Sequence, residues 1–177
     1  CEIGAVKIGM VPSAEHARVI GESLAGRGLP IVLDPVISAT SGRLLGETGT
    51  LEALKAHLMP LAACLTPNLP EAAILLGATP AASEEAMAGQ ARALLALGPR
   101  AVLLKGGHGK LGEAVDILAL PDGTRRFAGA WVDTSNLHGT GCALSSALTA
   151  HLARGCALAD AVQHAKAWLA DRLKAGI

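Results

Sequence analysis

The stretch IVLDPV, Ile31 to Val36, decides the fold class of this 177-residue chain. Its apolar residues follow one another without polar alternation, which is typical of a strand covered on both faces. Asp34 and Pro35 end the run and leave a carboxylate at the end of the strand. The stretch therefore predicts a buried parallel strand in an α/β sheet, with an acid at its carboxyl end.

Similar apolar runs lie on both sides of this strand, AVKIGMV at 5–11 before it and AACLTP at 62–67 and AVLLKGG at 101–107 after it. Helical patterns separate and follow the runs. We expect helices at residues 13–24, 50–59, 68–77, 83–97, 140–153 and 158–173. Strands that alternate with helices predict a mostly parallel sheet.

The segments EAVDILAL (113–120) and TRRFAGAWV (124–132) alternate between apolar and polar residues. The turn Pro121-Asp122-Gly123 separates them, so they predict an antiparallel hairpin. The expected fold is one α/β domain over residues 1–177, with a mostly parallel central sheet and this hairpin at its edge.

The composition argues against several classes of partner. Lys+Arg and Asp+Glu both number 15, and the chain has two Trp, one Phe and no Tyr. This balance gives no electrostatic footprint for nucleic acid or a membrane surface, and few rings on which bases could stack. No segment has the length of a spanning helix and no signal peptide is visible. We expect a small-molecule ligand or another subunit as partner.

The four cysteines form no C-x-x-C pair, and no pair of His or Cys has the spacing of a metal site. A disulfide framework is not expected in a chain so sparse in cysteine, which favours a reducing cytoplasm. Among the histidines, His138 is expected to hold its loop, and His151 to be partly buried or solvated on a helix. His108 lies in a loop and is compatible with either role.

Candidate polar residues follow the predicted strands. Asp34 ends the second strand, Asn68 and Glu71 follow the third, and Lys105 ends the fourth. Ligands of such sheets bind beyond the carboxyl ends of the strands. We therefore expect these side chains, and the glycine turn before Cys142, to lie at one edge of the sheet.

The motif HGTGC opens the helix expected at 140–153. A helix N-terminus carries partial positive charge, and glycines let an anion approach the backbone, so Gly139, Thr140 and Gly141 can cradle a phosphoryl group. Cys142 would lie in the first turn, where a thiolate is favoured. The alternative is a small buried cysteine in an ordinary glycine turn.

The spacing Asn68-x-x-Glu71 also has two interpretations. The two oxygen-bearing side chains can share a helix face and serve Mg²⁺, or they can form a capping box. Asp34 is either a site acid or a turn residue, and Lys105 is either a phosphate-neutralising or a surface lysine. Together these residues match the requirements of phosphoryl transfer, which are Mg²⁺, cationic neutralisation, positioning and a base.

The motifs also resemble a known family. AVKIGM, VLDPV, SGRLL, LTPNLPEA, LLKGGH, EAVDIL and NLHGTGCALSSAL occur in this order over nearly the whole chain. They resemble the hydroxymethylpyrimidine/phosphomethylpyrimidine kinases of thiamine biosynthesis, in the ribokinase-like superfamily. The resemblance implies a three-layer α/β/α fold. It also implies ATP-dependent phosphorylation of 4-amino-5-hydroxymethyl-2-methylpyrimidine and then of its monophosphate.

The resemblance implies roles for the candidate residues. Cys142 is implied as the catalytic base, beside an anion hole formed by Gly139, Thr140 and Gly141. Asp34, Asn68 and Glu71 are implied as a Mg²⁺–phosphate network, in which Asp34 and Glu71 are the metal ligands. Lys105 is implied to contact the phosphates of ATP. Gly9 and Met10 are implied to line the pyrimidine pocket. The implied cofactors are ATP and Mg²⁺, and the implied assembly is a homodimer.

Two departures accompany the resemblance. Leu137 stands where many members carry Thr, and the family has an N-terminal portion before AVKIGM, with early strands and a pyrimidine-binding flap. We expect a polypeptide that starts at Cys1 to lack kinase activity. The alternatives are a pyridoxal kinase of the same superfamily and a non-catalytic module that binds a pyrimidine phosphate.

Overall fold

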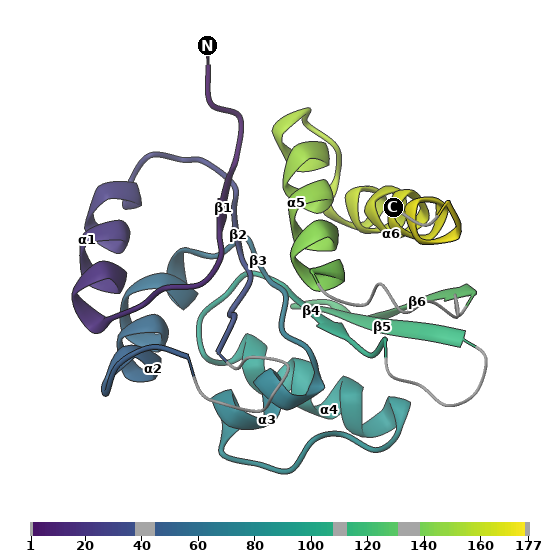
Figure 1. Ribbon diagram of the computed structural model, residues 1–177, viewed down its shortest axis with the longest axis horizontal. Coiled ribbons are helices and arrows are strands. Elements are labelled where there is room, and N and C mark those ends of the chain that lie inside the picture. Colours follow the sequence, from purple (N-terminus) through teal and green to yellow (C-terminus); the bar gives the residue numbers. More distant parts are fainter. Residues whose placement is uncertain (1, 38–44, 108–112, 131–138, 176–177) are drawn as a thin grey trace.

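Six strands form a single sheet in the computed structural model, which describes residues 2–37, 45–107, 113–130 and 139–175 (Figure 1). Their spatial order follows the chain: β1 (Val6–Ile8), β2 (Ile31–Leu33), β3 (Cys64–Leu65), β4 (Val102–Lys105), β5 (Glu113–Leu120) and β6 (Gly123–Ala130). Strands β1 to β4 are parallel, and β5 and β6 continue the sheet as an antiparallel pair. The predicted mixed sheet is confirmed.

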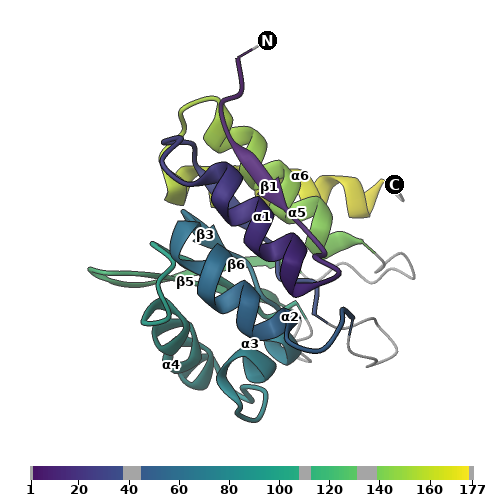
Figure 2. The ribbon, with the colours of Figure 1, turned by 90° about the vertical axis from the view of Figure 1, so that its left-hand side faces the viewer.

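Helices cover both faces of this sheet. One face carries α1 (Ala14–Leu24), α2 (Thr50–Ala53), α3 (Leu69–Leu76) and α4 (Glu84–Leu95), and the other carries α5 (Thr140–Ala153) and α6 (Leu158–Lys174). In Figure 2, α1 and α2 lie in front of the sheet and α5 and α6 lie behind β1. The expected three-layer arrangement is confirmed.

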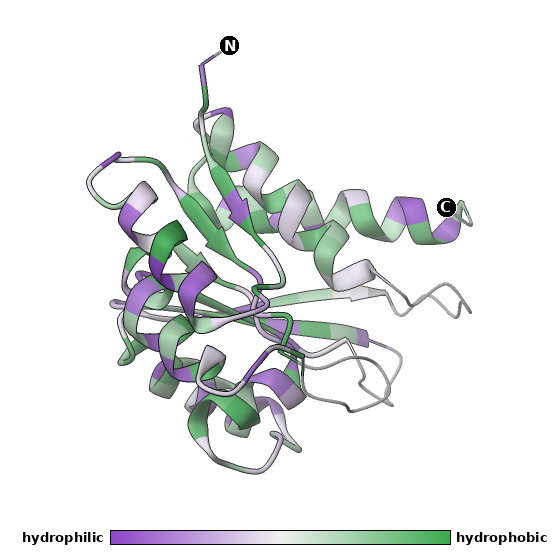
Figure 3. Ribbon diagram, turned by 60° about the vertical axis from the view of Figure 1, so that its left-hand side comes forward, coloured by the Kyte–Doolittle hydropathy of each residue, from purple (hydrophilic) through white to green (hydrophobic). Residues whose placement is uncertain are grey.

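Alternation along the strands divides the core between these two layers. In β2, Leu33 packs in the cluster under α1 to α4, whereas its neighbour Val32 packs under α5 and α6. Leu104 and Leu103 divide in the same way in β4. Because both faces are covered, strands of this kind are continuously hydrophobic. Figure 3 shows the central strands mostly in the colours of hydrophobic residues, while the helices carry both hydrophobic and hydrophilic residues.

Three of the predicted helix starts are capped by short polar side chains. Ser13 accepts a hydrogen bond from the His16 N–H, and Ser83 accepts one from the Ala86 N–H at 3.1 Å. Asn68 caps α3, which ends at Gly77 with φ 63°, a left-handed conformation that favours glycine. Local hydrogen bonding of short polar side chains therefore fixes where these helices begin.

The helix expected at 50–59 is less regular than predicted. After the four residues of α2, the chain continues as a π-helix over Leu54–Leu58 and a 3-10 turn over Met59–Leu61. Pro60 lacks an N–H group and cannot continue the α-helical hydrogen bonding. Leu58 and Met59 are both fully buried although they are neighbours in sequence, which the altered turn accommodates.

The β5–β6 hairpin has the predicted turn, with Leu120 opposite Gly123 across Pro121 and Asp122. Gly123 has φ 144°, in the region that favours glycine. Within the described ranges, the structure contains no helix long and apolar enough to cross a membrane.

Candidate active site at the carboxyl edge of the sheet

Strand alternation places the polar ends of β2 and β4 on the same face of the sheet. Asp34 lies two residues beyond Val32, and Lys105 lies two residues beyond Leu103. Because side chains two apart point to the same side, both polar groups face α5. Each of the two strands thus places one charged side chain at the same edge of the sheet, as expected.

Asp34 is the centre of this edge and is 1% exposed. Lys105 Nζ donates to its Oδ1 at 2.9 Å, and Lys7 Nζ lies 3.7 Å from its Oδ2. The hydroxyl of Ser145 donates to Oδ2 at 2.9 Å, and the hydroxyl of Thr66 donates to Oδ1 at 3.3 Å. Groups from three strands or strand ends and one helix therefore converge on one carboxylate.

The environment of Asp34 favours its charged form. Burial opposes the charge, but the positive charge of Lys105 and the hydrogen bonds from Lys105, Ser145 and Cys142 together lower the pKa of the carboxyl. Asp34 is therefore an anion at neutral pH, and Lys105 is held beside it. Asp34 also begins a tight turn, since its carbonyl accepts a hydrogen bond from the Val36 N–H at 2.8 Å. Its side chain nevertheless makes the contacts described above, and its role as a site acid stays a prediction.

The first turn of α5 lies against this ion pair. Gly139 begins the helix with φ 80°, and its carbonyl accepts the first helical hydrogen bond from Ala143 at 2.8 Å. A Cβ atom at Gly141 would lie 3.0 Å from Lys105 Nζ. The absence of a side chain at Gly141 therefore lets the ammonium group approach the helix N-terminus, so two sources of positive potential adjoin each other.

Cys142 is partly exposed in this first turn and donates a hydrogen bond to Asp34. Burial and the negative charge and hydrogen bonding of Asp34 raise the pKa of the thiol, while Lys7 and Lys105 oppose that rise. The expectation that this position favours a thiolate is therefore wrong for the arrangement seen. Burial and the carboxylate beside the sulfur together outweigh the cationic groups and favour the neutral thiol.

Asn68 and Glu71 form the capping box that the sequence allowed. The Asn68 side-chain carbonyl accepts from the Glu71 N–H, and Glu71 Oε2 accepts from the Asn68 N–H, both at 2.8 Å. Glu71 is 4% exposed, and burial raises its pKa against the opposing effects of the Asn68 N–H and Lys105. The structural role is confirmed, and the Mg²⁺ role remains a prediction.

The capping box lies next to Lys105 in the sheet. The Lys105 N–H donates to the Pro67 carbonyl at 2.8 Å, and Asn68 forms an isolated parallel bridge with Lys105. The positive charge of Lys105 acts on Glu71, and so does the negative charge of Asp34. The structure therefore brings the Asn68–Glu71 pair to the same edge as the ion pair.

Gly9 and Met10 follow β1 at this edge. A Cβ at Gly9 would lie 3.5 Å from Lys7 Nζ, and the Met10 side chain is 53% exposed. Met10 is therefore accessible to a ligand. His108, Leu137 and His138 lie outside the described residues, and His151 lies at the opposite end of α5, partly buried.

Sequence reasoning missed three partners of Asp34. Lys7 interrupts the apolar run AVKIGMV, and a charge within a predicted buried strand was a usable signal. Ser145 lies three residues after Cys142, on the same face of α5. Thr66 had no distinguishing signal before the sheet register was known.

A second missed group supports the backbone after Lys105. The Gly106 N–H donates to Asp116 Oδ1 at 3.0 Å, and Lys166 Nζ donates to Asp116 Oδ2 at 2.5 Å. Asp116 lies opposite Lys105 in the β4–β5 register. This pair ties α6 to the strand end that carries the candidate site.

The fold and the site are those of a class of α/β proteins whose ligands bind beyond the carboxyl ends of parallel strands. In this chain a helix N-terminus and a lysine, both suited to phosphate, lie at that edge. The profile of the phosphomethylpyrimidine kinase family matches residues 1–177. The chain belongs to this family, as its motifs indicated.

Curated relatives agree with this assignment. The chain is 45% identical to the hydroxymethylpyrimidine/phosphomethylpyrimidine kinase of Rhizobium meliloti, and the match covers 99% of this chain and 68% of the relative. It is 42% identical to the protein of the same name from Escherichia coli, with 97% and 65% covered. The chain thus spans about two thirds of the length of these relatives.

Solved structures share the fold. A phosphomethylpyrimidine kinase from Clostridium difficile superposes with a TM-score of 0.82 at 37% identity, covering 96% of this chain and 69% of that one. A pyridoxal kinase from Staphylococcus aureus in complex with AMP-PCP has a TM-score of 0.88 at 31% identity, with 97% and 62% covered. The expected ribokinase-like fold is confirmed by these neighbours.

Proposed function

We propose that this chain carries the site of an ATP-dependent kinase that phosphorylates 4-amino-5-hydroxymethyl-2-methylpyrimidine, and then its monophosphate, in thiamine biosynthesis. The family match and the names of the relatives support the reaction class and the substrate. The single observation that carries the proposal is the convergence of Asp34, Lys105 and the first turn of α5 at one edge.

In this proposal the phosphates lie against the first turn of α5, beside Lys105. Phosphoryl transfer requires positive potential on the transferring group and little covalent chemistry from the protein. Lys105 supplies a formal charge, and the backbone at Gly139, Thr140 and Gly141 supplies the helix N-terminus. The pair with Asp34 fixes the position of Lys105 before the ligand arrives, so little ordering is needed on binding.

We propose that Cys142 is the base that takes the proton of the substrate hydroxyl. The pKa of its thiol is raised, so the thiolate form increases as the pH rises through that pKa. The expected result is a kcat/KM that increases with pH on the alkaline side. A serine hydroxyl does not ionise in this pH range. Cys142→Ser should therefore lose the alkaline increase in kcat/KM together with most of the turnover.

The donor set fits a hard cation such as Mg²⁺, which prefers oxygen ligands and retains several waters. The Asp34 carboxylate receives Lys105 and Ser145, and we propose that it would hold the ion together with the Asn68–Glu71 pair. Bound Mg²⁺ would neutralise phosphate charge. Lys105 contributes the same neutralisation from the protein side.

The substrate pocket is proposed at Gly9 and Met10, because both follow β1 at the same edge and Met10 is accessible. A second candidate function is pyridoxal phosphorylation, which the likeness to the Staphylococcus aureus pyridoxal kinase supports. Turnover of pyridoxal and of the pyrimidine, measured side by side with the gene-encoded protein, distinguishes the two candidate functions.

The decisive experiment follows ATP-dependent conversion of the pyrimidine monophosphate to the diphosphate. We expect turnover by the gene-encoded protein and its loss in Cys142→Ala with ATP binding retained. Pyrimidine-phosphate binding without any turnover would instead indicate the non-catalytic module. Unchanged activity of Cys142→Ala would remove the thiol from the mechanism.

We also propose a cytoplasmic homodimer with no nucleic-acid or membrane partner. Cys64, Cys142 and Cys156 are free thiols, and the net charge is +0. Light scattering of the purified protein, with and without ATP, tests the assembly.

A further inference from the structure

Two histidines and a cysteine come together at the end of α5 that is remote from the candidate active site. His151 lies on α5, Cys156 on the connection to α6, and His164 on α6. Their potential ligand atoms, two imidazole nitrogens and one sulfur, all lie within 4.8 Å of one another. The spacing H-x4-C-x7-H matches no metal motif in the sequence, so this group becomes visible only in the fold.

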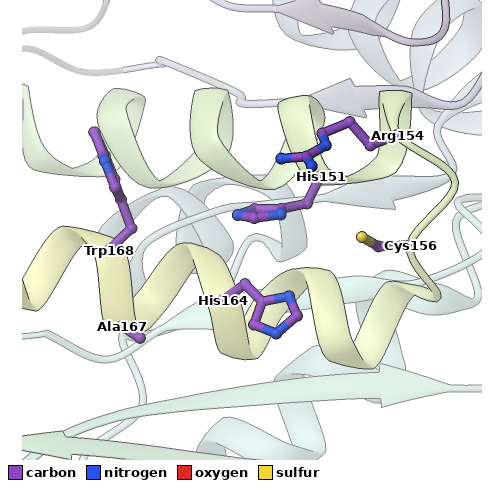
Figure 4. A pocket seen from close by; sticks show the side chains of 6 residues that line it. All are labelled: His151, Arg154, Cys156, His164, Ala167 and Trp168. Carbon is purple, nitrogen blue, oxygen red and sulfur yellow. The ribbon is translucent and has the colours of Figure 1, made fainter.

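The side chains are arranged around a shared space. In Figure 4, His151 projects from α5 toward α6, His164 lies below it, and the sulfur of Cys156 points toward both imidazoles. The two ring centroids are 5.1 Å apart, and the rings are tilted by 43°. The arrangement is therefore neither a parallel stack nor a set of unrelated surface side chains.

We propose that His151, Cys156 and His164 bind a Zn²⁺-class transition-metal ion. Two imidazoles and a thiolate are the donors preferred by Zn²⁺ and Cu²⁺, whereas Mg²⁺ and Ca²⁺ prefer oxygen. Metal–ligand bonds of about 2.0–2.3 Å in a tetrahedral site put ligand atoms roughly 3.3–3.8 Å apart. The three atoms therefore reach coordinating positions by closing about an ångström, within the range of side-chain rotation.

The surroundings permit entry of an ion and a further ligand. The three residues line a pocket of about 480 Å³ together with Arg154, Ala167 and Trp168. His164 is exposed and the other two ligands are partly exposed, so no backbone movement is needed for access. Three protein ligands leave a fourth position for water or an anion. Arg154 disfavours a bare dication and favours an anion in that position.

The site is separate from the proposed kinase centre. His151 follows Cys142 by nine residues on α5, which corresponds to about 14 Å along a helix axis. Binding would connect α5, the turn at Gly155 and α6, and would release the thiol proton of Cys156 to solvent as the metal–sulfur bond forms. A metal that binds only the folded chain stabilises it by mass action.

The test uses metal-free protein, as its gene encodes it, titrated with Zn²⁺ against a chromophoric chelator. We expect one ion per chain at this site, a higher melting temperature with Zn²⁺, and release of at least one proton. Titration with Co²⁺ should give a sulfur-to-cobalt charge-transfer band with intense visible bands of tetrahedral type. Cys156→Ser and His164→Ala should each weaken binding by about 100-fold or more.

The controls decide which atoms hold the ion. His57→Ala removes an exposed histidine on the opposite helical layer and should leave Zn²⁺ affinity unchanged. Arg154→Ala should tighten Zn²⁺ binding by about two- to fivefold, since it removes a nearby positive charge. Absence of Zn²⁺ uptake by the folded wild type would overturn the proposal. Uptake that survives Cys156→Ser and His164→Ala but is lost in Cys142→Ser would overturn it as well.

Discussion

Two buried Asp–Lys pairs lie side by side on the same face of the sheet, and they differ in what surrounds them. In the Asp34–Lys105 pair the lysine and aspartate side chains are 11% and 2% exposed, and in the Asp116–Lys166 pair they are 11% and 6% exposed. Burial alone therefore does not separate them. Lys105 and Asp116 even face each other across β4 and β5.

The neighbours of each pair make the difference. Asp34 receives a second lysine, two hydroxyls and the Cys142 thiol, and its partner Lys105 adjoins the glycine turn of α5. Asp116 receives the Gly106 N–H and joins α6 to the sheet. A buried ion pair is weak evidence for function by itself, because structural pairs have the same burial. Its place beside an anion-binding helix start is what marks the first pair as a site.

The largest effect is expected from Asp34→Asn, which leaves Lys105 buried without its counter-charge. We expect a loss of about 3–5 kcal/mol in the free energy of unfolding, measured by denaturant titration. Turnover should fall by about 100-fold or more, because the cation beside the phosphates loses its fixed position.

The pH dependence gives an independent check on Asp34. Its pKa is lower in the folded state than its ordinary value of 3.8, so its stabilisation is present above that value and is lost as the pH falls. Asp34→Asn should therefore unfold with a weaker dependence on acidic pH than the wild type. The double variant Asp34→Asn/Lys105→Met should regain stability without regaining turnover; recovery of both would show that the pair is only structural.

The second pair should respond differently. Asp116→Asn leaves Lys166 without a charge partner and should lower the free energy of unfolding by about 3 kcal/mol. The asparagine can still accept the Gly106 N–H bond, so the turnover of the folded fraction should change little. Asp116→Asn/Lys166→Met should recover both stability and turnover. Loss of turnover in that stable double variant would erase the distinction between the two pairs.

The sequence predicted most of the fold because the local patterns of helix caps and apolar strands agree with the packing of the folded chain. The serine caps at 13 and 83 and the capping box at Asn68 fixed helix starts, and the continuous apolar strands implied cover on both faces. The prediction was less accurate at residues 50–61, where the chain leaves α-helical geometry near Pro60. The hydrophobic periodicity of the sequence carries no information about the packing that selects a π-helix.

The sequence also predicted which residues gather at the carboxyl edge, since strand ends and helix starts are visible in it. It predicted a favoured thiolate at Cys142 wrongly, because the pKa of the thiol depends on its burial and on its closeness to Asp34, a residue 108 positions away. The Asp116–Lys166 pair was missed for the same reason. Such side-chain pairings follow from register and helix placement, which no local pattern specifies.

An intermediate effect is expected at the backbone that links the two pairs. A Cβ at Gly106 would lie 2.3 Å from the Val115 carbonyl oxygen and 2.5 Å from Met87 Cε. Gly106→Ala should therefore destabilise the fold by about 1–3 kcal/mol and displace Lys105. Gly107→Ala is the matched control, since its Cβ would meet nothing within 4 Å. Equal melting temperatures of the two variants would contradict the close approach.

The smallest effect is expected at Asn68, which tests the site edge without touching either ion pair. Asn68→Ala removes the oxygen that accepts the Glu71 N–H and should cost about 1 kcal/mol in the free energy of unfolding. Asn68→Asp keeps an accepting oxygen and should preserve stability. Comparing the two variants at limiting and saturating Mg²⁺ then separates capping from ligation. If Asn68 only caps α3, turnover will follow stability in both variants. If it also serves the ion, Asn68→Asp will change the Mg²⁺ dependence by more than its effect on the melting temperature explains, because the added negative charge acts on the cation as well as on the helix N-terminus.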